Sequence, residues 1–463
     1  MSKDLAWRFS QVFGATSPAP VDEADIISTI EFDQTGSFLA VGDRGGRVVV
    51  FTRSTPTKTG KLPEYKFLVE FQSHEPSFDY LKSLEIDEKI NAIKWLPRRS
   101  ASRFLLSSND KTVKLWKIFT KTAHRFTDLN ITSDYRGRKE VVRRQKRIKK
   151  LKVPKMEIED VAVMASPCKN YENGHMFQIN SVSPNSDQQT FLSADDLRIN
   201  LWNLDVTSEC FQIVDKKPED MDELSEVITS AEFHPRHCNI FLYSTSKGCV
   251  KMADMRANAL CDRHSKQFEH TVDSKNSSFF ADFLSSISDA KFSRDGKFII
   301  ARDYVQLKVW DVRKEKEPFK TFDLHNHLRS RFCELYESDT IFDSFKCCAS
   351  PDSKYTLTGT YNNKFVIHNI ARGTAVNLEA AKFQPHKAAV DLSRKGTINS
   401  LNIPLSPAHH RMSNGNAKAA AAHSENLDFT KKILCTAWHP KENVIAIGTA
   451  SSLFTYNAVD ADK

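Results

Sequence analysis

Apolar and polar residues alternate over short stretches of the chain, and Thr190–Leu204, TFLSADDLRINLWNL, shows this pattern most clearly. The first letters, TFL, read as the end of one strand. Leu197–Trp202 then alternates with the period of two that is typical of a strand. Asp195 and Asp196 fall between the two strands, where carboxylates can accept backbone N–H groups of a tight turn. The stretch therefore predicts a hairpin with two carboxylates in an exposed turn, which is a first hint of a binding surface.

The same unit recurs seven times along the chain. Each copy reads as a strand, a polar turn, an apolar strand, a second polar turn and a third strand that ends in an aromatic residue or a substitute for one. The copies are Ile27–Arg53, Ile90–Ile118, Ile179–Leu204, Ile228–Arg256, Ile287–Arg313, Phe342–Ile370 and Leu434–Asn457. This repetition predicts an all-β repeat fold that spans residues 1–463 as a single domain.

Three strands that end in an aromatic residue resemble the inner part of a WD-repeat propeller blade. Only Trp310-Asp311 keeps the WD pair of residues. Ala253 stands at the aromatic position of the fourth copy, so neighbouring side chains must supply the missing bulk there. We therefore expect a seven-bladed WD-repeat β-propeller with a long hairpin arm and inserted loops.

The seventh copy ends at its third strand, since only Ala458–Lys463 follow it. Ala6–Val12, AWRFSQV, offers the missing fourth strand. We expect it to pair with Leu453–Tyr456, which would close the ring and remove an exposed sheet edge. The alternative is a frayed tail that only covers an apolar patch. Closure is favoured because Trp7 and Phe9 would be unusual residues to leave in a tail.

Three connectors between the copies stand out. Ser54–Lys89 is too apolar and too aromatic for a passive loop. Phe119–Gln178 is long enough for the hairpin arm and carries a basic run, Arg136–Lys155. Ala371–Ile433 includes Asn414–His423, NGNAKAAAAH, a low-complexity stretch typical of a flexible surface insertion.

The positive charge of the chain is local. The net charge is +8, and Arg136–Lys155 holds eleven Lys and Arg residues with one Glu, which leaves −2 for all other residues. This distribution argues against a broad nucleic-acid-binding surface. The run itself has three interpretations: a solvated hairpin, a nuclear-import or RNA-binding patch, or a docking arm for an acidic partner. The absence of interleaved aromatic residues weakens the RNA-binding interpretation.

Cysteine usage and hydropathy indicate the cellular compartment in which the protein is expected. Nine cysteines occur without a C-x-x-C pair, as expected of free thiols in a reducing compartment. The first residues, MSKDLAWRFS, lack the apolar core of a signal peptide, and no apolar run approaches the roughly 20 residues of a membrane span. We expect a cytoplasmic protein, with the nucleus as a second location and no membrane partner.

No motif points to catalysis. The sequence contains no H-E-x-x-H, no G-x-S-x-G and no G-x-x-x-x-G-K-[ST]. Gly42–Gly46, GDRGG, fits a hairpin turn better than a phosphate loop, and Cys347 and Cys348 point to opposite faces of a predicted strand. We also find no polar constellation that would line the central channel of an enzymatic propeller. Neither an enzyme nor a metal or cofactor is therefore expected.

Five longer stretches resemble the B-family WD-repeat regulatory subunits of protein phosphatase 2A. They are FQSHEPSFDYLKSLEIDEKIN, FLSADDLRINLWNL, EVITSAEFHP, ALCDRHSKQFE and TAWHPKEN, and the resemblance runs from about Trp7 to Tyr456. It implies a non-catalytic subunit that binds a HEAT-repeat scaffold subunit and the phosphatase catalytic subunit and recruits phosphoprotein substrates. It also implies that the arm within Phe119–Gln178 reaches the scaffold, so the basic run would belong to a docking arm.

The resemblance further implies a substrate groove. Its positions in this sequence are Glu23, Arg44, Phe78, Leu81, Glu85, Asp87, Phe177, Asp196, Leu224, Phe280, Tyr336 and Phe342. Each lies in a connector that leads into the first strand of a copy or in the turn between its second and third strands, and in a propeller these segments share one face. Carboxylates mixed with aromatic residues suit basic, partly disordered substrates. Two positions depart from the family: Arg44 is a lysine in many relatives, and Phe177-Gln178 replaces Tyr-His.

Three rival functions remain open at this point. A propeller adaptor outside phosphatase biology, such as a ubiquitin-ligase or chromatin subunit, would need the same fold without the five stretches quoted above. An enzymatic propeller would need a polar constellation in the channel. A nucleic-acid-binding protein would rest on Arg136–Lys155 alone.

Overall fold

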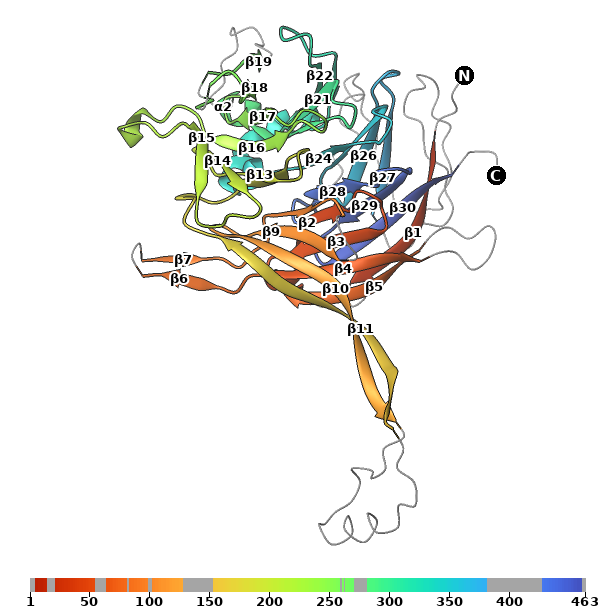
Figure 1. Ribbon diagram of the computed structural model, residues 1–463. Helices are drawn as coiled ribbons and strands as arrows, with labels where there is room; N and C mark the ends of the chain where they lie inside the picture. Colours follow the sequence, from red (N-terminus) through yellow and green to blue (C-terminus); the bar gives the residue numbers. More distant parts are fainter. Residues whose placement is uncertain are drawn as a thin grey trace, which may run out of the picture.

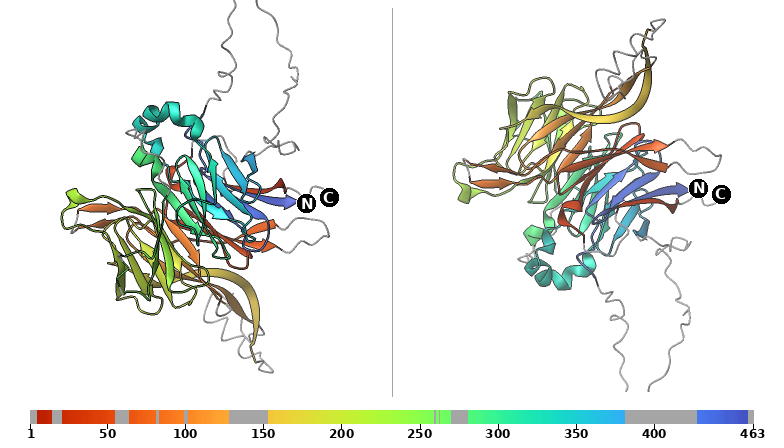
Figure 2. Two further views of the ribbon diagram at one scale, coloured as in Figure 1. Left: turned by 90° about the horizontal axis from the view of Figure 1, so that it is seen from above. Right: turned by 90° about the horizontal axis from the view of Figure 1, so that it is seen from below.

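The structure is a computed structural model built almost entirely from short antiparallel strands. It describes residues 5–14, 21–54, 64–80, 83–98, 102–127, 153–258, 260–261, 263–269, 281–380 and 427–459. These residues form seven four-stranded antiparallel sheets and one two-stranded hairpin. Figures 1 and 2 show the sheets grouped around a common centre, and the predicted β-propeller is confirmed.

Each sheet contributes one strand to the centre of the molecule. The first strands are β2 (Ile27–Phe32), β8 (Ala92–Trp95), β12 (Ser181–Pro184), β16 (Ile228–Phe233), β20 (Ile287–Phe292), β24 (Cys347–Ala349) and β28 (Cys435–Trp438). Each contacts the next in chain order, and β28 contacts β2, so these strands form a closed ring.

The other strands follow outward in each sheet. The second strands are β3 (Phe38–Asp43), β9 (Arg103–Ser108), β13 (Thr190–Ala194), β17 (Ile240–Thr245), β21 (Phe298–Asp303), β25 (Tyr355–Gly359) and β29 (Val444–Gly448). The third strands are β4 (Arg47–Ser54), β10 (Val113–Thr127), β14 (Arg198–Asn203), β18 (Val250–Asp254), β22 (Gln306–Asp311), β26 (Lys364–Asn369) and β30 (Ser452–Val459). The outer strands are β5 (Glu64–Gln72), β11 (Lys155–Tyr171), β15 (Cys210–Asp215), β19 (Lys266–Phe268), β23 (Lys320–Asp323), β27 (Ala375–Glu379) and β1 (Ala6–Gly14).

The N-terminal strand completes the last sheet, as the sequence predicted. β1 is antiparallel to β30 in the order β1-β30-β29-β28, with Phe9 opposite Tyr456 and Val12 opposite Phe454. Trp7 packs edge-on against Trp438 with ring centroids 5.4 Å apart. The pairing therefore joins the two ends of the chain in one sheet.

The predicted hairpin arm is also present. β10 and β11 continue beyond their sheet as a two-stranded ribbon that projects from the propeller in Figure 1. The pairing reaches Thr127, opposite Lys155. Residues 136–152 of the basic run lie outside the described residues, and so does the low-complexity stretch Asn414–His423.

A buried hydrogen-bond network holds the third sheet together. His175 Nδ1 lies 2.9 Å from a carboxylate oxygen of Asp195, and its Nε2 lies 2.5 Å from Ser193 Oγ. Trp202 Nε1 donates to the same hydroxyl at 2.8 Å. Asp195 has no exposed surface, so the prediction of two exposed carboxylates in this turn is wrong for Asp195. Of these two carboxylates, only Asp196 has exposed surface with which it could contact a ligand.

Neighbouring aromatic residues compensate for the small residue at the aromatic position of the fourth sheet. Ala253 is fully buried in a cluster with Phe233, Phe241 and Tyr243. The rings of Phe233 and Phe241 lie edge to face, with centroids 6.2 Å apart. The bulk expected around Ala253 is therefore supplied by the two inner strands of the same sheet.

Charged side chains line the central cavity, contrary to the sequence analysis. Lys94 Nζ lies 3.1 Å from Glu31 Oε1 and links the first two sheets. Asp289 lies 3.5 Å from Lys291 of the same strand and 3.9 Å from Lys346, and the second contact links the fifth and sixth sheets. Burial alone would raise the pKa of Asp289, but the two lysines hold it below its ordinary value. These charges are paired with one another, within one strand or between neighbouring sheets, which indicates a structural role.

Stability should fall on mild acidification because buried histidines cannot accept a proton in the folded state. Burial, aided by Lys114, lowers the pKa of His74 to about 3, and burial, aided by Arg302, lowers that of His368 to about 4. In the unfolded chain both rings titrate near 6.5. Their stabilising contribution is therefore present above pH 6.5 and is lost as the pH falls towards the folded-state values.

Each buried ring should lower the unfolding free energy by about 1.4 kcal/mol for every pH unit between its unfolded-state and folded-state pKa values. Urea unfolding between about pH 7.5 and pH 5 measures this slope. His74→Asn should flatten it, whereas His124→Asn, on the exposed arm, should not. An unfolding free energy that is constant over this range would contradict the expectation.

Candidate functional site

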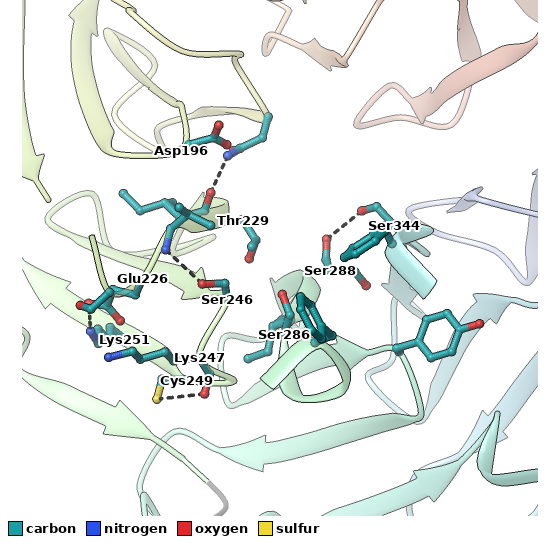
Figure 3. A pocket seen from close by; sticks show the side chains of 18 of the residues that line it. Asp196, Glu226, Thr229, Ser246, Lys247, Cys249, Lys251, Ser286, Ser288 and Ser344 are labelled. Carbon is teal, nitrogen blue, oxygen red and sulfur yellow. Dashed lines mark hydrogen bonds and ion pairs between the residues drawn. The ribbon is translucent and has the colours of Figure 1, made fainter. Parts of the chain in front are cut away.

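A pocket of about 930 Å³ opens on the face that carries the turns between second and third strands. Its lining includes Asp196, Glu226, Lys251, Phe283 and Phe342 (Figure 3). Two predicted groove residues, Asp196 and Phe342, therefore border one cavity. The predicted Leu224 is half-buried and directly precedes Ser225, which also lines the pocket.

The turn that carries Asp196 is held from both sides. The Asp195 carboxylate accepts the N–H groups of Leu197 and Arg198 at 2.8 and 2.7 Å. The carbonyl of Asp196 accepts the N–H of Ile228 at 2.7 Å and so ties the turn to the next sheet. The Asp196 side chain is half-buried and forms no ion pair with any described residue. Burial, followed by the charge of Asp195, raises the pKa of Asp196, so a bound cation would relieve an unfavourable charge.

Three aromatic rings form a second part of the site. Phe283 in α2 (Ala281–Ser285), Tyr336 in α3 (Phe332–Glu337) and Phe342 in η5 (Thr340–Phe342) lie with ring centroids 5.6 to 5.9 Å apart. The 3₁₀ helix η4 (Asn326–Arg331) directly precedes α3. Tyr336 and Phe342 are exposed, as expected of an apolar surface that binds a partner.

The sixth copy of the repeat was predicted to begin with a strand at Phe342, and Phe283 was not among the predicted groove residues. Phe342 instead lies in the connector, five residues before β24 begins at Cys347. Phe283 belongs to the run SSFFADFL, whose apolar residues could have indicated a packed helical turn. Phe280, the neighbouring predicted residue, lies outside the described residues.

A short hairpin projects beside this face. β6 (Ser77–Asp79) pairs with β7 (Leu84–Ile86), which places Phe78 opposite Glu85, and Figure 1 shows the hairpin extending from the propeller. Phe78 packs edge-on against Tyr80, which is 86% exposed and was missed by the sequence analysis. Asp87 is exposed, and its carbonyl accepts a hydrogen bond from Asn109 at 3.0 Å. The predicted Leu81 lies outside the described residues.

Three acidic residues on this face of the first sheet, or just before it, are already paired with arginines. Glu23, in η1 (Glu23–Asp25), lies 2.5 Å from Arg44. Arg47 contacts both Asp25 and Asp43. Such exposed pairs contribute about 0–1 kcal/mol each, yet a basic ligand must displace them. Glu23 is therefore a weaker predicted contact than Asp196.

The remaining predicted residue lies before the third sheet. Phe177 is half-buried in the connector that leads to β12. Its neighbour Met176 is held through its carbonyl, which accepts a hydrogen bond from Lys111 Nζ. Phe177 therefore sits on the same face as the Asp196 turn, although it does not line the pocket.

In the described part of the chain, no three His, Cys, Asp or Glu side chains converge in a way that could hold a metal ion. Among the same residues, no helix is long and apolar enough to cross a membrane. The chemistry of the face is thus that of carboxylates, lysines and exposed aromatic rings.

Comparison with known proteins identifies the family. A profile of the WD domain, G-beta repeat, matches residues 166–203, which contain the His175–Asp195–Trp202 network. The regulatory subunit phr2AB of serine/threonine-protein phosphatase 2A from Dictyostelium discoideum is 43% identical over 493 aligned residues, covering 99% of this chain and 100% of the relative. This chain belongs to the WD-repeat regulatory subunits of protein phosphatase 2A. The stretches that resembled this family in the sequence therefore mark a true relationship, and a regulatory role follows from it.

Proposed function

We propose that this regulatory subunit is non-catalytic, binds a HEAT-repeat scaffold subunit and the phosphatase catalytic subunit, and recruits phosphoprotein substrates through the pocketed face. The observation that carries the proposal is that the unpaired carboxylate of Asp196 and the exposed ring of Phe342 border the same pocket. The subunit would work in the cytoplasm and also in the nucleus.

The chemistry of the face suits recruitment of basic segments. A half-buried carboxylate that forms no ion pair with a described residue favours a lysine or arginine of the substrate, and Glu85 and Asp87 add negative potential from the neighbouring hairpin. The aromatic rings of Phe283, Tyr336 and Phe342 offer an apolar contact at the other side of the pocket. Recruitment of this kind requires no catalytic group on this chain, because the reaction occurs on the catalytic subunit.

The arm supports the proposed scaffold contact. Met156 and Ile158 lie two positions apart in β11 and so point to one face, and Phe126 lies opposite Met156 on β10. All three side chains are largely exposed on a two-stranded ribbon, which has no core of its own. This arm begins at the end of β10 remote from the turn between β9 and β10, so it leaves the propeller away from the pocketed face.

Introducing two carboxylates on the apolar face of the arm should weaken scaffold binding. Met156→Asp with Ile158→Asp removes two exposed apolar side chains, and we expect an affinity loss of about tenfold or more. The measurement is co-purification of the scaffold subunit with the full-length chain. Arg125→Asp, on the opposite face of the ribbon, is the matched control. Unchanged scaffold binding by the double variant would contradict the proposed docking role.

A further inference from the structure

Charges of both signs remain unpaired around the pocket. Lys251 Nζ lies 2.5 Å from Glu226 Oε1, and Lys216 Nζ lies 3.8 Å from the same oxygen, so one carboxylate serves two amines. Lys247 also lines the pocket, is exposed, and forms no ion pair within the described residues. At the other side of the pocket, Asp196 is an unpaired carboxylate. The pocket therefore presents a lysine and an aspartate that form no ion pair within the described residues.

The other carboxylates of the pocket are not equivalent to Asp196. Glu226 is held by lysines, and Asp343 lies 2.5 Å from Lys432. Glu269 accepts a hydrogen bond from the Gln267 amide at 2.7 Å. Among these side chains, Asp196 is the one whose carboxylate forms neither an ion pair with a lysine nor a hydrogen bond with an amide in the described part of the chain, and a basic ligand group should prefer it.

The two turns that carry Asp196 and Lys247 are held relative to one another by the backbone. Asp196 and Lys247 occupy corresponding turns of neighbouring sheets, between β13 and β14 and between β17 and β18. The N–H of Ile228 donates to the carbonyl of Asp196 at 2.7 Å, and the N–H of Ser246 donates to the carbonyl of Val227 at 2.9 Å. The N–H of Val227 donates in return to Ser246 Oγ at 3.1 Å. The neighbouring connector residues Val227 and Ile228 are thus hydrogen-bonded to both turns.

The turn at Lys247 is also rigid. Gly248 has φ +80°, a conformation that other residues rarely adopt, and its N–H donates to the carbonyl of Thr245 at 3.2 Å. Figure 3 shows Asp196 on one side of the pocket and Lys247 with Lys251 on another, with Thr229 and Ser246 between them. A ligand that contacts both charges must therefore span the distance between these two turns.

We propose that the pocket recognises a ligand segment by both signs of charge: a lysine or arginine on Asp196 and an anionic side chain, carboxylate or phosphate, on Lys247. An apolar residue of the same segment packs on Phe283 and Phe342. This inference rests on the proposed recruitment function and narrows its substrate class from basic segments to segments of mixed charge. It also gives the segment one direction, because the two open charges cannot be exchanged.

The test uses the full-length chain and fluorescently labelled peptides of equal length. The parent peptide carries a lysine, a leucine and a glutamate in that order, and variants replace the lysine by glutamine, replace the glutamate by glutamine or phosphoserine, or reverse the order. Fluorescence anisotropy gives each Kd. Replacing the glutamate by glutamine should raise the Kd about two- to fivefold on the wild-type chain. The reversed peptide should bind more weakly by a similar factor.

Exchanging the charges of Lys247 and of the peptide's glutamate tests whether these two groups bind each other. With Lys247→Glu the parent peptide should bind more weakly, and a peptide with lysine in place of its glutamate should recover the loss. Lys354→Glu makes the same change in the exposed turn between β24 and β25, which lies on the opposite face, and should leave every Kd unchanged. Thermal unfolding of each variant confirms that the exposed substitutions leave the fold intact. The phosphoserine peptide shows whether a phosphate binds better than a carboxylate.

The outcomes separate this inference from the function on which it rests. If the peptide's lysine contributes to binding through Asp196 but the glutamate-to-glutamine change has no effect, recognition by both signs is wrong and recruitment of basic segments stands. If neither peptide charge affects binding to the wild-type chain, both proposals fail. If the glutamate contributes equally to binding by the Lys247→Glu variant, Lys247 is not its partner and the inference is overturned.

Discussion

Asp196→Lys should slow dephosphorylation of a recruited basic protein by the assembled phosphatase while its activity on a small phosphopeptide stays unchanged. The substitution places a second positive charge where the substrate's lysine or arginine would bind. The half-buried position of Asp196 makes the repulsion stronger than at an exposed rim, so we expect about a tenfold or larger loss of kcat/KM for the protein substrate. The measurement is the ratio of the two rates for wild-type and variant holoenzyme.

A matched variant separates the local effect from the change in net charge. Glu317→Lys alters the charge equally in the exposed turn between β22 and β23, on the opposite face, and should leave both rates unchanged. Equal losses on the protein and the small peptide would show that Asp196 supports assembly or folding. Unchanged rates on both would show that basic substrates bind elsewhere.

Deleting residues 1–14 should destabilise the whole propeller. The deletion removes β1 and with it the aromatic contacts of Trp7 with Trp438, of Phe9 with Tyr456, and of Phe13 with Phe51 in the first sheet. Each large apolar side chain contributes about 1.5–3 kcal/mol when buried, so we expect a loss of about 5 kcal/mol or more. Thermal unfolding measures the effect as a lower Tm.

The control for this deletion is removal of residues 1–4 alone, which precede β1. That shorter deletion should leave the Tm close to that of the full chain. If loss of residues 1–14 also leaves the Tm unchanged, the strand does not close the ring in solution. The Tm of the Trp7→Ala variant should lie between those of the two deletions, because this substitution removes one ring contact and keeps the backbone pairing.

The repeat pattern was sufficient to predict the fold because each strand carries its own signal. Apolar residues of period two, polar turns and a terminal aromatic residue are all local features, and they recur in every sheet. Even the closure by β1 could be predicted, since the seventh copy lacked an outer strand and Trp7 needed a place to pack. The bulk around Ala253 could be expected as well, although not that Phe233 and Phe241 would supply it.

The site was predicted less completely because pairing between side chains is not local. The sequence placed Asp195 and Asp196 in one turn, but not the distant His175 that buries the first and leaves the second open. The ion pair between Arg44 and Glu23 likewise could not be predicted from the sequence. The charges of the central cavity were missed for the same reason, since Glu31 and Lys94 meet across two sheets.

The pairing of β1 with β30 also sets the order in which the protein can be completed during synthesis. Ala6 lies opposite Val459, so β1, the first of the described strands to be synthesised, must wait for β30, the last of them. Until then the apolar residues of β1 have no partner and the seventh sheet has a free edge, a state that favours misassociation with other chains. The final step is a contact of very large sequence separation, which forms slowly. Nascent chains of this subunit should therefore remain open until β30 has been synthesised, and they should be most in need of protection from aggregation during that interval.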